Sequence, residues 1–303
     1  MNSSAFIVTL IGTIASVFVM SLNAFLLFST RKKKHDIALF YFRFYIDVFF
    51  GLSYFLYSFF ILGFALYENA FFISNSALFW LGLPFSNASA ARTFLILLVV
   101  LDRLLIVSVP NIVTPFQATS LPIKYHNIRP SVPNFFILIL PILFTGVEDF
   151  VIFVICGMNS HSIPVTCVAF PCTLNSCGYS WWTSYKSVIF PIIIIFTVIL
   201  CVKLIIFSKR LKNSVAATRA NRLALIDAFV IFIFDCIPSF LANQFPNSPL
   251  VEYTSTGPVT AMLKQVGRTI ESIIFVELLV RRSSKVEDSK KKSSQPVFTL
   301  AKH

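Results

Sequence analysis

The segment PVTAMLKQVGRTIESIIFVELLV, residues 258–280, decides how many times this chain crosses a membrane. It is as long as a bilayer-spanning helix, which needs about 20 residues, but it contains Lys264, Arg268, Glu271 and Glu277. Each such charge costs about 2.5–3.5 kcal/mol at the centre of a spanning helix. Hydropathy alone therefore leaves the segment ambiguous, and the distribution of charge along the rest of the chain has to settle the question.

The composition of the 303-residue chain is that of a membrane protein with several spans. Hydrophobic residues make up 56% of it and charged residues 13%, whereas soluble domains carry roughly 25% charged residues. A chain this apolar cannot hide its surface in one water-solvated core, which excludes an ordinary cytosolic enzyme and a disordered protein. Anionic lipid of the inner leaflet accounts for the net charge of +12 without a nucleic-acid partner.

Six further apolar segments of spanning length precede residues 258–280; they cover about 5–30, 37–66, 80–107, 134–156, 186–208 and 222–245. Seventeen of the 25 Lys and Arg residues lie in the loops after spans one, three and five and in the tail, 281–303, while the intervening loops carry none. Positive charge stays on the cytoplasmic side of a membrane. The sequence therefore predicts an all-α membrane protein, a seven-transmembrane helix bundle with an extracellular N-terminus, a cytoplasmic C-terminus and a disordered basic tail.

Charged residues inside the predicted spans mark candidate sites, because ionisable groups at membrane depth face the interior of a helix bundle. Arg43 and Asp47 of span two are four residues apart on one helix face. We expect them to neutralise each other near the cytoplasmic end of the span.

A second set of charges lies in spans three, six and seven. Lys264, Arg268 and Glu271 share one stripe of a helix, and Asp235 of span six falls at the depth of Arg268 when each residue adds 1.5 Å. We expect an Asp235–Arg268 contact, with Arg92 of span three at a similar depth. Arg92, Asp235, Lys264 and Arg268 are then candidates for an outward-open ligand pocket; the alternative is that they only fix helix packing.

The end of span three reads LDRLLIV, residues 101–107. The Asp102–Arg103 pair resembles the acidic-Arg element at the same place in G-protein-coupled receptors. In such a switch Arg103 is held by a carboxylate at rest and is released to the partner when span six moves. Asp227, at the inner end of span six, is the candidate holder. The alternative is a charge pair on the positive side of the membrane that switches nothing.

Three further segments extend this resemblance: PIKYHNIR at 122–129, NRLALIDAF at 221–229 and FDCIP at 234–238. With them the chain resembles, over nearly its whole length, a nematode serpentine chemoreceptor of the Srbc class. The resemblance implies a small-molecule ligand from the environment, a heterotrimeric G protein as partner, and a place in the plasma membrane of sensory-neuron cilia. Residues 111–121 interrupt the family pattern, either as a true insertion or as a gene-model error.

Four cysteines lie in or beside the second outer loop: Cys156, Cys167, Cys172 and Cys177. This side of the membrane is oxidising, so disulfides are expected, and four thiols allow three connectivities. Since no cysteine lies at the top of span three, any bridge is internal to the loop. Zinc binding is disfavoured, because His161 is the only histidine nearby.

Two alternative functions remain open: a ligand-gated cation channel with seven spans, which has the opposite orientation, and a small-solute transporter, which usually has repeated halves. The sequence shows no nucleophile–base set, no phosphate-binding loop and no metal-site spacing. We therefore expect no enzymatic activity, no cofactor and no metal.

The orientation can be tested with accessible tags. On intact cells, antibody should bind a tag fused before Met1 and should bind a tag fused after His303 only after permeabilisation, because the basic loops and tail stay in the cytosol. Flow cytometry measures both signals. A tag after His303 that is reachable from outside would contradict seven spans, and a cytoplasmic N-terminus would favour the channel.

Overall fold

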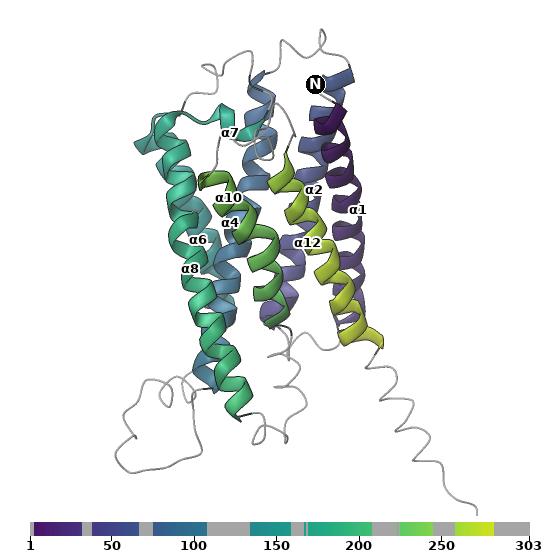
Figure 1. Ribbon diagram of the computed structural model, residues 1–303, viewed down its shortest axis with the longest axis vertical. Coiled ribbons are helices and arrows are strands. Elements are labelled where there is room, and N and C mark those ends of the chain that lie inside the picture. Colours follow the sequence, from purple (N-terminus) through teal and green to yellow (C-terminus); the bar gives the residue numbers. More distant parts are fainter. Residues whose placement is uncertain are drawn as a thin grey trace, which may run out of the picture.

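The computed structural model describes residues 3–31, 38–66, 75–107, 134–158, 167, 169–207, 223, 225–244 and 258–281. These residues are nearly all helical and include no strand. The long helices run up and down to form one bundle (Figure 1). We call the end where α1 and α8 begin the N-terminal end, and the end where the last helix finishes the C-terminal end.

Seven rods of helix correspond to the seven predicted spans. The first three are single helices, α1 (Ser3–Ser29), α2 (Ala38–Leu66) and α4 (Asn75–Val107). Span four is α6 (Asn134–Phe150) continued by the π-turn η5 (Val151–Ile155), and span five is α8 (Ser176–Phe207), preceded by the short α7 (Phe170–Thr173). Span six comprises helical residues 225–231, η8 (Phe232–Cys236) and α10 (Ile237–Gln244), and span seven is α12 (Val259–Val276) with η9 (Glu277–Arg281).

Two helices begin earlier than the predicted spans. Helix α4 starts at Asn75 and not near 80, and α8 starts at Ser176 and not at Lys186. Hydropathy marks the stretch that fits the bilayer, but a helix continues beyond it as long as its backbone hydrogen bonds are met. The early start of α8 places Lys186 well inside the helix.

Prolines lie inside several of these helices without ending them: Pro84, Pro141 and Pro191. Pro238 is the second residue of α10, one residue beyond the end of η8. Since proline has no N–H to donate to the carbonyl four residues back, the wider π-turn at 232–236 accommodates the irregularity in span six. Span six is therefore not a straight rod at the depth where Asp235 lies.

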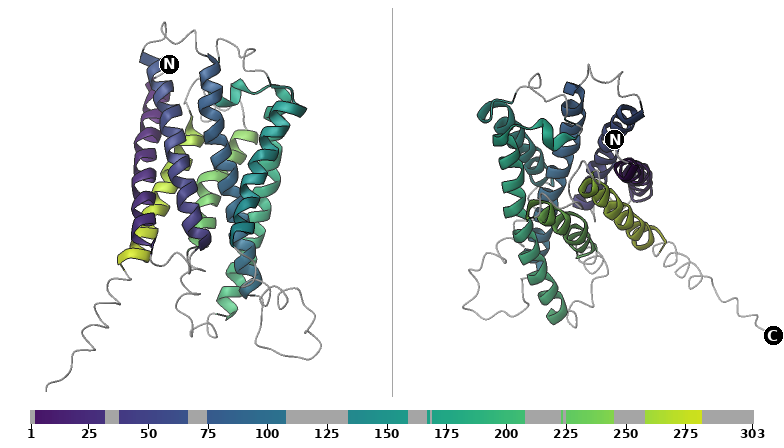
Figure 2. Two further views of the ribbon diagram at one scale, coloured as in Figure 1. Left: turned by 180° about the vertical axis from the view of Figure 1, so that it is seen from behind. Right: turned by 45° about the horizontal axis from the view of Figure 1, so that its top comes forward.

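Spans that follow one another in the chain pack against each other, and α12 closes the bundle by packing against α1. Helix α2 contacts both α1 and α4 (Figure 2). Helix α4 is central, because it contacts α2, α6 and α8. Polar contacts join α1 to α12: the amide of Asn23 donates to Ser272 at 2.9 Å, and the hydroxyl of Thr269 to the Ala15 carbonyl at 3.2 Å.

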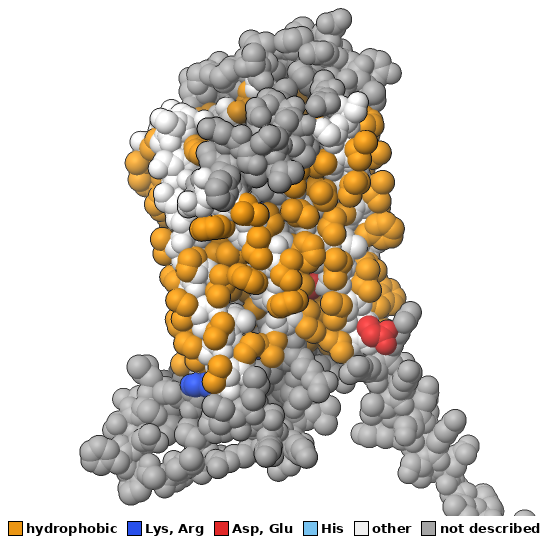
Figure 3. Space-filling model, in the orientation of Figure 1, with side chains coloured by type: hydrophobic (Ala, Val, Ile, Leu, Met, Phe, Trp, Pro, Cys, Tyr) orange, Lys and Arg blue, Asp and Glu red, His pale blue; other side chains and the backbone are white. Residues whose placement is uncertain are grey.

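The outside of the bundle is apolar. Large hydrophobic side chains cover the face drawn in Figure 3, and Phe28 and Phe59 are 80% and 66% exposed. Among the described residues, three helical stretches meet the length and composition of a membrane span: Ser3–Ser29, Leu39–Gly63 and Ser176–Lys203. A belt of this kind needs a lipid environment, since the hydrophobic effect disfavours its exposure to water.

Gly267 allows span seven to approach span six. A Cβ added there would lie 2.5 Å from the Cβ of Phe234 in η8, whereas a Cβ at Gly146, on the exposed side of α6, meets nothing within 4 Å. We expect Gly267→Ala to destabilise the purified protein by about 1–3 kcal/mol through overpacking.

Gly146→Ala is the matched control and should be neutral or slightly stabilising, because alanine favours helix. Thermal unfolding in detergent measures both variants. Equal midpoints for the two variants would show that α12 and η8 are not in this close contact.

Candidate functional site

Six fully buried charged side chains meet inside the bundle, and we call them the charge cluster. Each has a side-chain exposure of 1% or less. They come from four spans: Arg43 and Asp47 of α2, Arg92 of α4, Asp227 of span six, and Arg268 and Glu271 of α12. Three guanidinium groups face three carboxylates, so the cluster is formally neutral.

Arg43 and Arg92 share the same carboxylates. Arg43 lies 3.2 Å from Asp47, 3.2 Å from Asp227 and 2.6 Å from Glu271. Arg92 lies 2.7 Å from Asp47 and 3.5 Å from Asp227, and it also contacts Glu271. The predicted Arg43–Asp47 pair is thus present, but it belongs to a network that joins spans two, three, six and seven.

Arg268 of α12 is the third arginine of the charge cluster. Its guanidinium is 3.9 Å from Asp47 and lies 3.2 Å above the ring centre of Phe50. Arg43 makes a similar contact with Phe275, at 4.6 Å. These rings cover faces of the guanidinium groups that carboxylates do not reach, and the cation–π attraction offsets part of the cost of burial.

The predicted Asp235–Arg268 contact is wrong. Asp235 pairs with Lys264 at 2.9 Å, and Arg268 turns to Asp47 and Phe50. Lys264 and Arg268 are one turn apart on the same stripe of α12, and a depth count along straight helices cannot choose between neighbours so close. The π-turn that contains Asp235 shifts the register further.

A pocket of about 260 Å³ lies between α8, span six and α12, toward the N-terminal end. Its lining includes Trp182, Lys186, Phe190, Phe240, Thr260 and Lys264. Of the four residues predicted to surround a ligand, Lys264 lines this pocket and Asp235 pairs with it, whereas Arg92 and Arg268 lie in the charge cluster. The four residues are therefore divided between the pocket and the charge cluster, which are connected along α12, where Lys264 and Arg268 lie one turn apart.

Sequence reasoning missed Lys186. Its ammonium lies 2.9 Å from the ring centre of Trp182, one turn earlier on α8. The prediction placed Lys186 at the boundary of span five, where a lysine is unremarkable. The signal was the Trp181–Trp182 pair just before it, because tryptophans gather at the membrane interface. A helix that begins before these rings places Lys186 inside the bundle.

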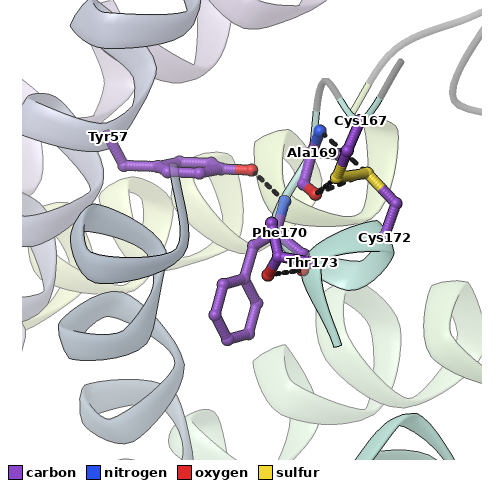
Figure 4. The surroundings of a disulfide bond; sticks show 6 residues. All are labelled: Tyr57, Cys167, Ala169, Phe170, Cys172 and Thr173. Atoms are coloured by element: carbon purple, nitrogen blue, oxygen red, sulfur yellow. Dashed lines mark hydrogen bonds between the residues drawn. A yellow bond between two sulfur atoms is a disulfide. The ribbon is translucent and has the colours of Figure 1, made fainter. Parts of the chain in front are cut away.

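A disulfide-braced segment, residues 167 and 169–173, lies at the N-terminal end of the bundle, where the pocket is, and we call it the cover (Figure 1). The cysteines pair as Cys156–Cys177, which ties span four to the start of α8, and as Cys167–Cys172, which ties α7 to the residue shortly before it. Figure 4 shows the backbone N–H of Phe170 donating to the Tyr57 hydroxyl, at 2.8 Å.

The ring of Phe170 anchors this cover. It packs against Gly82 of α4, where there is no room for a larger side chain, and edge-on to Trp182. Trp182 in turn donates to the Ser86 hydroxyl at 2.9 Å. The cover, α4 and the pocket wall are thus in direct contact.

At the opposite end of α4, Arg103 lies 3.6 Å from its neighbour Asp102. Asp227, the predicted holder of Arg103, lies instead in the charge cluster with Arg43 and Arg92. Asp227 lies in the interior of the helix bundle because its two arginine partners come from α2 and α4. The residues next to Asp227 in the sequence do not reveal this tertiary arrangement. Residues 111–121 lie outside the described residues.

Comparison with known families identifies the class. Residues 1–283 match the family described as serpentine type 7TM GPCR chemoreceptor Srbc. The chain belongs to this family, a receptor family and not a family of enzymes, and it is a multi-pass membrane protein. A search of curated proteins finds no match.

The Lys264–Asp235 pair predicts a specific rescue. Asp235→Lys or Lys264→Asp alone should cost about 3–5 kcal/mol, because each leaves two like charges buried together. The double variant restores an opposite pair and should recover most of the surface level and thermal midpoint. As a control, Asp235→Arg combined with Arg268→Asp should not recover, and a rescue there would contradict the observed pairing.

Proposed function

We propose that this chain is a chemosensory receptor of the plasma membrane that binds a small extracellular molecule in the pocket and signals to a heterotrimeric G protein by movement of span six. The family match supports the receptor class. The single observation that carries the finer proposal is the pair of ionic contacts along span six: Asp235 with Lys264 beside the pocket, and Asp227 in the charge cluster.

These two contacts connect the pocket to the cluster. Asp227 and Asp235 are eight residues apart, about 12 Å along a helix. A ligand that draws Lys264 away from Asp235 loosens span six from α12 at the pocket. Because Lys264 and Arg268 share one stripe of α12, the same displacement reaches the charge cluster.

Movement of span six then depends on Asp227. At rest Asp227 is held by Arg43 and Arg92, at 3.2 and 3.5 Å. When span six moves, these contacts break and the cluster is left with an excess positive charge, which makes the moved state costly without ligand. A ligand favours the moved state only by as much as it binds that state more tightly.

We base the proposed orientation on the basic loops and tail. With the N-terminus outside, the pocket lies in the extracellular half and Arg103 lies at the cytoplasmic end, where a G protein binds. Sensory-neuron cilia are the proposed location, on the strength of the family.

A second-messenger assay tests this function. Cells that express the receptor are exposed to a panel of small molecules while cAMP or calcium is recorded. We expect an active compound whose response falls at least about tenfold in Arg103→Ala at unchanged surface level, because allosteric coupling between two sites is typically worth 5–150-fold.

Lys203→Ala, at the same end of α8, is the matched control and should keep its response. A ligand-evoked current that persists in cells lacking G proteins would instead establish the channel alternative, and concentrative uptake of the compound would establish a transporter.

A further inference from the structure

The described residues that line the pocket carry two positive charges and no negative one. Lys186 of α8 and Lys264 of α12 both line it, while no Asp or Glu is among the described residues that do so. Because both ammonium groups line the same cavity of about 260 Å³, their like charges repel each other. The rest of the lining is aromatic, aliphatic or neutral and polar.

The carboxylates near these lysines do not line the pocket. Asp235 is 2.9 Å from Lys264, and the buried Glu148 of α6 is near Lys186 and Tyr185. Neither carboxylate is among the lining residues. A molecule in the pocket therefore contacts ammonium groups, and the described lining residues offer an amine no carboxylate to pair with.

Lys186 is the stronger anchor of the two lysines. Lys264 already has Asp235 as an ion-pair partner, whereas among the described residues no carboxylate lies within ion-pair distance of Lys186. Its ammonium rests on the Trp182 ring at 2.9 Å. An aromatic face leaves ammonium protons available, so an anion gains a charge-assisted hydrogen bond there.

We propose that this pocket recognises a small organic acid, with its carboxylate between Lys186 and Lys264 and its apolar or aromatic body against Phe190, Pro191 and Phe240. The proposal rests on the proposed function, because it assigns the class of ligand for the same site. A volume of about 260 Å³ restricts the body to a small one. An anion between the lysines also relieves their repulsion and competes with Asp235 for Lys264.

Thermal unfolding of the purified full-length receptor in detergent tests this assignment without a G protein. The probes are matched sets on aromatic, branched and linear bodies, such as phenylacetate, phenylacetamide and phenethylamine. We expect at least one carboxylate to stabilise the receptor with an apparent affinity about tenfold or more above that of its amide, the effect of a single charged contact, and amines to be weakest.

Two variants isolate the anchor. Lys186→Gln should abolish the preference for the carboxylate, and Lys186→Arg should keep it. Lys203→Gln removes a positive charge from the same helix outside the pocket and should leave the preference unchanged.

Three results would overturn the proposal: amides or amines that stabilise as well as the acids, a preference that survives in Lys186→Gln, or stabilisation by an anionic phospholipid in the micelle and by none of the soluble acids. Each can occur while signalling through a G protein stands. Conversely, a receptor that binds acids but drives no second messenger would contradict the proposed function and leave the ligand class intact.

Discussion

The guanidinium groups of Arg43 and Arg92 share the carboxylates of Asp47, Asp227 and Glu271 inside the bundle. Any one of these charges would be expensive at membrane depth, and a buried charge that loses its partner is strongly destabilising. The contacts cross between helices, so a span that shifts breaks ion pairs, and a shift of α4 or span six leaves the rest of the charge cluster with a net charge, because each contributes a single charged residue. The relative positions of spans two, three, six and seven follow from this requirement.

The pocket depends on the same requirement. Span seven carries Lys264 and Arg268 one turn apart; Arg268 turns into the charge cluster, and Lys264 is left at the pocket with Asp235. On the other wall Lys186 rests on Trp182, which contacts the disulfide-braced cover through Phe170. A short stripe of α12 thus connects the charge cluster with the pocket.

Sequence reasoning identified all the intramembrane charges of spans two, three, six and seven, because such residues stand out in apolar helices. It found the local pair Arg43–Asp47, whose spacing of four residues makes it visible. It chose Arg268 in place of Lys264 as the partner of Asp235, since depth alone cannot separate residues one turn apart. It missed Lys186, because hydropathy marks the apolar stretch and not the point where α8 begins.

The sequence by itself determined the number of spans and the existence of a charged interior. The length of an apolar segment and the positive charge of the loop beside it are local properties, and they decide whether that segment crosses the membrane. The tertiary structure alone decided which charges of different helices meet. Ion pairing depends on how helices rotate and where they deviate from straight rods, as at the π-turn that contains Asp235. Those features arise from side chains of several helices packing together, and no single segment encodes them.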